Sequence, residues 1–302
     1  MSRRLTVLNR YLARVEKPAL ARLGPDVARR RFDRQAALFR DPLGARYRAE
    51  TLGGVPVTWA ETGPEGAGAG VIIWLHGGAH VIGSVRTHRA MVARLAQLCG
   101  WRACLPEMRR APEHPFPAAL EDAGAVWEAL RAAGHDRIVL AGNSSGGGLA
   151  LALAARLLAR GEHPAALVLM SPWTDLTGTA TSLRENADRD VLLPVTRFDE
   201  ARRLYLGTAD PRDPGASPLF ADFPGCPPVW IQASRAEILR DDSLHMADHL
   251  RAGGAEVELD LSDDLPHVCA IFQGWLPEAD EVLDHAARFI RARCPAGSSG
   301  GR

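Results

Sequence analysis

A serine in a strained-turn pattern is the first feature of the sequence that could do chemistry. Gly142-Asn143-Ser144-Ser145-Gly146 matches G-x-S-x-G, between an apolar run at 138–141 and a helix-prone run after it. In such a strand-to-helix turn, glycines two positions before and after the serine remove collisions and lift its hydroxyl above the sheet. Ser145 would need a glycine at 143, so Ser144 is the predicted nucleophile. The alternative is a purely structural role, in which these residues form a glycine-rich helix start with an N-cap serine.

A serine of this kind needs a histidine base, which follows the serine and an acid along the chain. His267 fits this order, because the apolar run 257–261, an Asp-Asp turn and Pro266 precede it. His285 is the competitor, but it lies within a regular helical pattern. We therefore predict that His267 is the base.

Three acids, Glu237, Asp241 and Asp242, follow the apolar run 229–233. Asp241 and Asp242 begin a helical run, where acids cap free N–H groups and complement the helix dipole. Glu237 alone lies in the loop where an acid could orient a histidine. Glu237 is the predicted acid, and Asp241 remains the alternative.

The segment His76-Gly77-Gly78-Ala79 follows the apolar run 71–75. An acyl carbon attacked by serine develops an oxyanion, which fixed backbone N–H groups stabilise, each contributing roughly 10²–10³ in rate. Consecutive glycines let the backbone approach a substrate closely, and the Ser145 N–H at a helix start can face the same point. A common tight Gly-Gly turn is the plain alternative.

These residues need a scaffold that brings distant segments together. Six short apolar runs alternate with helical stretches, which predicts a mostly parallel sheet covered on both faces. The runs are 71–75, 102–105, 138–141, 166–170, 229–233 and 257–261; the helical stretches are 87–98, 117–132, 146–160, 242–252 and 279–293.

Three segments stand outside this alternation. Residues 1–40 predict two or more amphipathic helices, interrupted at Pro18 and Pro25. Residues 173–215 form a long mixed stretch without a clean strand, as functional lids often do. Residues 295–302, rich in Gly and Ser, should be disordered. The remaining residues, 41–294, form the predicted catalytic domain.

Composition excludes several classes of function. The chain has 36 basic and 36 acidic residues, and no basic stripe alternates with aromatics, so we expect no nucleic-acid partner. The five cysteines are scattered without a C-x-x-C pair, so we expect neither metal nor disulfide framework. No run approaches the ~20 apolar residues of a membrane span, and no signal sequence is evident. We expect a soluble cytoplasmic protein without a membrane partner.

Several motifs, in order, resemble one family. HGGAHVIGS at 76–84 resembles the HGGG segment of the hormone-sensitive-lipase-like esterases (bacterial family IV), and RRAPEHPFPAALED at 109–122 resembles the segment that follows it. GNSSGG at 142–147 resembles the family's GDSAGG elbow, and SPWTDL at 171–176 is similar to its next motif. The resemblance runs from about residue 50 to the C-terminal helix. It departs at Ala79, His80, Met108 and Arg110.

The resemblance implies a fold and roles for particular residues. The fold would be an α/β-hydrolase with a mostly parallel eight-stranded sheet, capped by residues 1–40 and 173–215. Gly78, Ala79 and Ser145 would donate to the oxyanion, with Gly77 as a further candidate, and His80 would line the substrate pocket. Glu237 stands at the catalytic acid of the family's DxLxD(D/E) segment. His267 lies in the matching Pro-His-Val motif.

The implied activity is hydrolysis of short- to medium-chain carboxylic esters by water through an acyl-enzyme. The motifs also resemble the branch with monoterpene lactone hydrolases, so cyclic esters are candidate substrates. Two alternatives stay open: amide hydrolysis, as in arylformamidases, and a ligand-binding receptor on the same fold. The resemblance implies no cofactor and no metal. A homodimer is a candidate assembly, because family members often dimerise.

Overall fold

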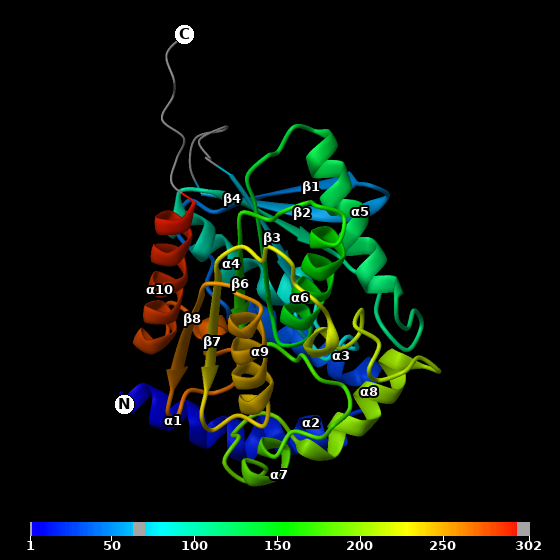
Figure 1. Cartoon of the computed structure of the whole chain (residues 1–302). Helices are drawn as coiled ribbons and strands as arrows, with labels where there is room; N and C mark the ends of the chain where they lie inside the picture. Colours follow the sequence, from blue (N-terminus) through cyan, green and yellow to red (C-terminus); the bar gives the residue numbers. More distant parts are fainter. Residues whose placement is uncertain (1, 63–69, 295–302) are drawn as a thin grey trace.

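The computed structural model describes residues 2–62 and 70–294, and an eight-stranded sheet forms its centre (Figure 1). The strand order is β1-β2-β4-β3-β5-β6-β7-β8; β2 is antiparallel to both neighbours, and β3 to β8 pair in parallel. The strands are β1 (Arg46–Leu52), β2 (Val55–Glu61), β3 (Val71–Leu75), β4 (Arg102–Pro106), β5 (Ile138–Asn143), β6 (Ala166–Met170), β7 (Val229–Ser234) and β8 (Val257–Ser262). The predicted mostly parallel sheet is confirmed.

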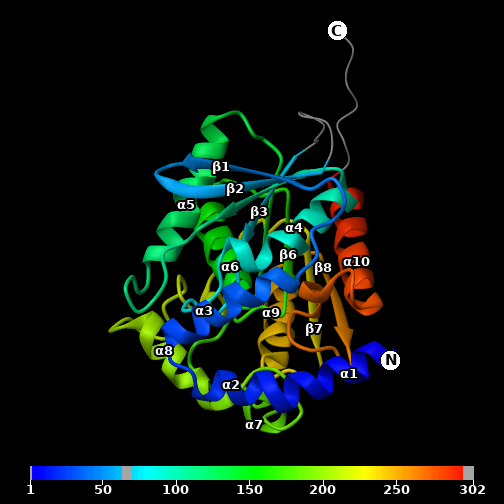
Figure 2. The ribbon, with the colours of Figure 1, turned by 180° about the vertical axis from the view of Figure 1, so that it is seen from behind.

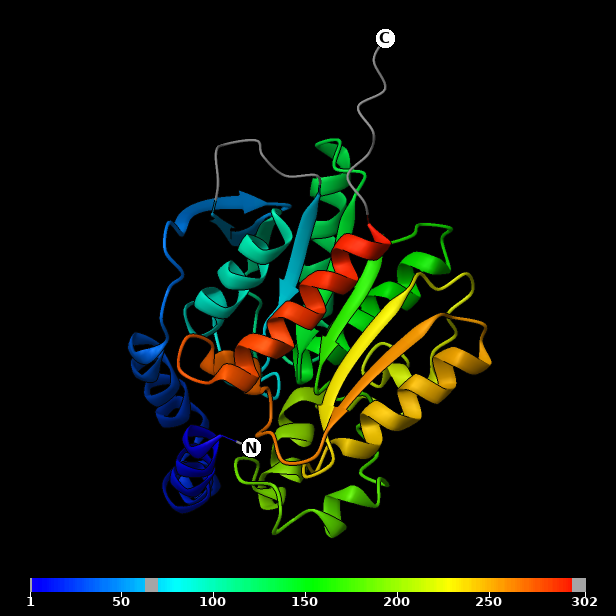
Figure 3. The ribbon, with the colours of Figure 1, turned by 90° about the vertical axis from the view of Figure 1, so that its left-hand side faces the viewer.

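Helices cover both faces of this sheet, so its central strands are buried along their whole length. Along β3, Val71, Ile73 and Leu75 pack toward one face, with α5 (Ala118–Ala132), α6 (Ser145–Leu158) and α9 (Arg240–Ala252). Ile72 and Trp74 pack toward the other, with α4 (Val85–Cys99) and α10 (Pro277–Arg293). Figure 3 shows α10 lying across its face of the sheet. Side chains alternate between two buried faces, as a parallel sheet requires.

The antiparallel hairpin β1–β2 has no counterpart among the apolar runs named from the sequence. Gly53 and Gly54 form its turn with φ of 56° and 82°, values that glycine adopts without strain. In β2, Val55, Val57 and Trp59 are buried, whereas β1 is largely exposed. A one-sided edge hairpin carries a weaker apolar signal than a strand buried on both faces.

The N-terminal helix is longer than the sequence predicted. α1 (Arg3–Tyr11) continues through a π-helical turn (Leu12–Glu16) into α2 (Lys17–Arg22), so the predicted break at Pro18 is wrong. In this turn the Lys17 N–H donates to the Leu12 carbonyl five residues back, and Pro18 falls in the first turn of α2, where its missing N–H is tolerated. The predicted break at Pro25 is confirmed, because α3 (Pro25–Gln35) begins there.

Residues 173–215 contain α7 (Ser182–Glu185), α8 (Phe198–Leu206) and, within this described segment, no strand. They pack against the N-terminal helices: Lys17 Nζ donates to the carbonyls of Ala187 and Asp190, both at 2.6 Å, and Arg197 Nε donates to the Leu20 carbonyl at 3.1 Å. α2 and α8 accordingly lie close together in Figure 2. The predicted disordered tail, 295–302, lies outside the described residues.

Asp242 ties the start of α9 to the loop after β6. Its Oδ1 accepts hydrogen bonds from the backbone N–H groups of Thr174 (2.7 Å) and Asp175 (2.9 Å), and its side chain is fully enclosed. Burial raises the pKa of Asp242 to about 7, and the two N–H donors oppose this rise only in part.

This raised pKa makes stability pH-dependent. Because the folded pKa exceeds the ordinary value of 3.8, the folded state binds the proton more tightly. The contribution of Asp242 to the free energy of unfolding is full below about pH 4 and is lost as pH rises through about 7. Asp242→Asn keeps the acceptor oxygen but cannot titrate. We expect its Tm to fall a few degrees less than the wild-type Tm between pH 5 and pH 8, measured by calorimetry, since about 1 kcal/mol moves Tm roughly 2–4 °C. An equal change of Tm with pH in the wild type and in Asp242→Asn would contradict this prediction.

Candidate active site

The chain makes a strained turn at Ser144, between β5 and α6. Ser144 has φ 53° and ψ −127°, a conformation that non-glycine residues rarely adopt. A Cβ on Gly142 would lie 2.3 Å from the Gly146 carbonyl oxygen, and one on Gly146 would lie 2.1 Å from that of Leu75. Only glycine fits at these two positions, as the sequence pattern requires.

Glu237 and His267 form a buried pair at the ends of β7 and β8. His267 Nδ1–H donates to Glu237 Oε2 at 2.7 Å, and the two residues are 6% and 1% exposed. Glu237 Oε1 accepts from the Ser171 hydroxyl at 2.8 Å and from the Ser234 N–H at 2.9 Å. The carboxylate is thus fixed by three donors. The bond to Nδ1 selects the tautomer that leaves His267 Nε2 free to accept a proton.

The competing acid and histidine have other partners. Asp241 Oδ2 accepts from the Thr181 hydroxyl and the Ser182 N–H, both at 2.8 Å, and so holds the start of α7. His285 Nδ1 contacts Asp260 Oδ2 at 2.8 Å on an exposed face of α10. Neither forms a hydrogen bond with His267 or Ser144 in the described part of the chain.

Strand order brings the candidate residues to one edge of the sheet. Ser144, Ser171, Glu237 and His267 follow β5, β6, β7 and β8, which are neighbours in that order. Between the first two strand ends, the Ser144 N–H donates to the Met170 carbonyl at 2.9 Å. The Ser144 hydroxyl makes no hydrogen bond among the described residues. In unliganded serine sites, the bond from nucleophile to base often tightens only when substrate binds.

The loop after β3 turns its backbone toward the elbow. Gly78, Ala79 and His80 have φ of 120°, 55° and 61°, and the His80 N–H donates to Ser145 Oγ at 3.1 Å. Within the described residues, the N–H groups of Gly78, Ala79 and Ser145 donate to no protein acceptor. The Gly77 N–H instead donates to Asn143 Oδ1 at 3.2 Å. Gly77 is therefore the weakest of the four candidate oxyanion donors.

Asn143 holds this loop against the elbow, a role that sequence reasoning missed. Its Oδ1 also accepts from Trp74 Nε1 at 3.2 Å, and its Nδ2 donates to His88 Nε2 at 3.2 Å. Burial lowers the pKa of His88 to about 3, which keeps its Nε2 an acceptor. An aspartate, as in the GDSAGG pattern, has no N–H to donate there. The asparagine in GNSSGG was the available signal.

His80 links the loop after β3 to α8. Its ring stacks on Tyr205, with centroids 3.5 Å apart and planes at 6°, and Trp173 lies 6.1 Å away. Burial lowers the pKa of His80 to about 3, so the ring is neutral at physiological pH. Tyr205 is 1% exposed. These rings form an aromatic wall beside the loop that carries Ala79.

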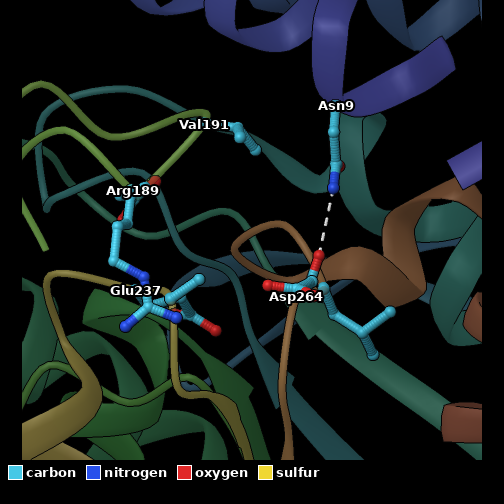
Figure 4. Close-up of a pocket in the computed structure, with 8 residues that line it drawn as sticks. Asn9, Arg189, Val191, Glu237 and Asp264 are labelled. Carbon is cyan, nitrogen blue, oxygen red and sulfur yellow. Dashed lines mark hydrogen bonds between the residues drawn. The ribbon is translucent and has the colours of Figure 1, made fainter. Parts of the chain in front are cut away.

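A pocket of about 240 Å³ lies next to the acid, where α1 meets the loops after β7 and β8. Figure 4 shows Arg189 pointing toward Glu237, while Asn9 Nδ2 donates to the Asp264 carbonyl at 3.0 Å. The pocket is lined by Asn9, Arg189, Asp190, Val191, Ala236, Glu237, Asp264 and Leu265. It reaches the acid from the side of the N-terminal helix. Over residues 2–62 and 70–294, no group of three or more His, Cys, Asp or Glu is arranged to hold a metal ion.

Comparison with known proteins places this geometry in a family. A family model described as alpha/beta hydrolase fold matches residues 72–271. LipR of Mycobacterium tuberculosis is 38% identical over 253 residues, 82% of each chain. An esterase of Acinetobacter venetianus is 34% identical over 281 residues, 92% of each chain.

Solved structures agree. An esterase from the bacterial hormone-sensitive lipase family superposes with a TM-score of 0.92 at 35% identity, covering 97% of this chain and 99% of that one. The chain therefore belongs to the α/β-hydrolase fold family. Within it, the chain is a member of the hormone-sensitive-lipase-like, bacterial family IV, branch.

Ser171 offers a test of how the acid is held. Ser171→Ala removes one of three donors to Glu237 and leaves the other two in place. A hydrogen bond to a charged group contributes about 1.5–3 kcal/mol. We expect kcat for p-nitrophenyl acetate to fall roughly 10–100-fold, with KM within about twofold of wild type. Steady-state kinetics of the wild type and the variant measure both values, and equal Tm values for the two proteins exclude a loss of stability as the cause. An unchanged kcat would mean that the other two donors hold the carboxylate unaided.

Proposed function

We propose that this protein is a serine carboxylesterase in which Ser144 is the nucleophile, His267 the general base and Glu237 the acid that orients the histidine. The observation that carries the proposal is the buried 2.7 Å hydrogen bond between His267 and Glu237, at the edge where Ser144 stands in its strained turn. Two relatives, an esterase and an acetyl-hydrolase, are matched over 92% and 81% of their lengths and support the same reaction class.

The reaction proceeds in two halves. His267 Nε2 takes the Ser144 proton as Oγ attacks the acyl carbon, and the carbonyl electrons move onto the oxygen. The N–H groups of Gly78, Ala79 and Ser145 stabilise that oxyanion, and Glu237 stabilises the imidazolium. The alcohol leaves with the proton from His267. Water then repeats the sequence on the acyl-enzyme and releases the acid.

The proposed cap consists of residues 1–40 and 173–215. Support comes from the bonds of Lys17 and Arg197 between the two segments, and from an apolar cluster in which Leu183 and Leu206 pack with Val81 beside the oxyanion loop. His80 and Tyr205 join this cap to the core by their stacked rings. We place the acyl chain of the substrate beside the aromatic wall of His80 and Tyr205, which would limit its length. Short- to medium-chain esters are therefore the proposed substrates, with small lactones as further candidates.

The elbow gives a paired test of the nucleophile. Ser144→Ala removes Oγ and should lower kcat by about 10⁶, as in other triads. Ser145→Ala keeps the N–H proposed for the oxyanion and loses only the acceptor for His80, so we expect a loss of about tenfold or less. Hydrolysis of p-nitrophenyl acetate by the two variants measures both values. If Ser145→Ala lowered kcat more than Ser144→Ala does, Ser144 would not be the nucleophile.

A substrate panel separates the proposed ester hydrolysis from its alternatives. We expect p-nitrophenyl acetate to hexanoate to react fastest, and dodecanoate to react at least about tenfold more slowly because the wall limits chain length. Phenyl acetate should exceed N-formylaniline in kcat/KM, and a small lactone series tests cyclic esters. Faster cleavage of the formamide would favour an amidase. No turnover on any substrate would favour a ligand-binding protein.

A further inference from the structure

The N-terminal helices carry a charge imbalance that the whole-chain balance conceals. Residues 1–40 contain eleven basic and three acidic side chains, although the full chain has 36 of each. Glu16 is the only acid before residue 26, and it is buried, with its carboxylate bound to Arg31 at 2.8 Å and to the Tyr11 hydroxyl. The exposed charged side chains of α1 and the π-helical turn are therefore all cationic.

Large apolar side chains are exposed in the same segment. Val7, Tyr11 and Val15 are 67%, 47% and 44% exposed, and their four-residue spacing puts them on one side of the helix. Of the eight large apolar side chains that stand exposed among the described residues, six lie between residues 7 and 43. Such clustering is unlike the scattered exposure normal for protein surfaces.

Basic side chains flank this apolar stripe without partners of their own. Arg10 and Arg14 are exposed and, within the described residues, form no ion pair or side-chain hydrogen bond. At the flank, Arg4 donates to the carbonyl of the exposed Trp275 at 3.1 Å, and the Arg40 guanidinium lies 3.7 Å from that indole ring. We call Val7, Arg10, Tyr11, Arg14 and Val15 the N-terminal face. α1 and α2 run along one outer edge of the molecule in Figures 1 and 2.

We propose that the N-terminal face docks on the surface of an anionic lipid bilayer, with the arginines on lipid phosphates and the apolar stripe in the headgroup region. A basic amphipathic helix with aromatic and aliphatic side chains on its exposed side has the chemistry of an interfacial helix. The charge argues against a second copy, because a two-fold contact would set cations against cations. The apolar stripe beside these arginines would gain nothing on a nucleic-acid backbone.

Binding at the surface of a bilayer requires no helix that crosses it. No helix in residues 2–62 and 70–294 is long and apolar enough to cross a membrane. The sequence expectation of no membrane partner rested on that lack of a spanning segment, which leaves surface binding open. Docking through α1 would place the proposed cap against the bilayer. It does not depend on the catalytic roles assigned to Ser144, Glu237 or His267.

Vesicle co-sedimentation of the full chain tests the proposal. We expect binding to vesicles of phosphatidylcholine mixed with phosphatidylglycerol, little binding to phosphatidylcholine alone, and weaker binding as salt is added. Arg10→Gln with Arg14→Gln should weaken partitioning about 30-fold, since each arginine near an anionic surface contributes roughly fivefold. Val7→Ser with Val15→Ser should weaken it about fivefold without changing the charge.

A matched control separates this face from overall charge. Arg131→Gln with Arg288→Gln removes two exposed arginines from α5 and α10, outside the proposed cap, and partitioning should stay within about twofold of wild type. An equal loss in this control, or no binding of the wild type at low salt, overturns the proposal. So does a wild-type dimer in sedimentation velocity that Val7→Ser with Val15→Ser dissociates. Hydrolysis of p-nitrophenyl acetate in buffer should be equal in all variants; its absence with vesicle binding intact would defeat the proposed function alone.

Discussion

The site depends on one constraint, the absence of space around the turn at Ser144. The backbone of β3 and the first turn of α6 approach so closely that a single carbon on Gly142 or Gly146 would overlap a carbonyl oxygen. That closeness forces Ser144 into a left-handed conformation and sets the start of α6 beside the loop after β3. Such strain persists only where the surroundings over-determine it. Here the enclosing β5, β6 and α6 are almost wholly buried.

Around that turn, hydrogen bonds join loops that are distant in sequence. Asn143 connects the elbow to Gly77 and His88, and Ser171 connects the end of β6 to Glu237. Each donor or acceptor is enclosed, so a lost partner leaves an unsatisfied polar group at a cost of about 1–3 kcal/mol. The candidate catalytic groups are therefore held by the scaffold before any substrate arrives, which is the condition for electrostatic stabilisation of a transition state.

The sequence predicted the parts of this arrangement that local chemistry dictates. Buried parallel strands such as β3 appear in the sequence as continuous apolar runs, and the glycines two positions before and after Ser144 are the ones that the strained turn requires. The chain order of serine, acid and histidine, each after an apolar run, led to the prediction that Ser144, Glu237 and His267 lie at one edge of the sheet. The partners Asn143, His88 and Ser171 were missed because their contacts cross more than fifty residues. The helix was predicted to break at Pro18, but a π-helical turn precedes Pro18 and the chain stays helical. The β1–β2 hairpin was missed because only one of its faces is buried.

A crystal structure of the protein after reaction with a fluorophosphonate would show whether these groups converge on one tetrahedral centre, since the phosphonyl group mimics the tetrahedral intermediate. We predict a covalent bond to Ser144 Oγ, with the phosphonyl oxygen about 2.7–3.1 Å from the N–H groups of Gly78, Ala79 and Ser145. We also predict His267 Nε2 within hydrogen-bonding reach of the Ser144 oxygen. An adduct on Ser145, or a phosphonyl oxygen turned away from those amides toward solvent, would contradict these roles.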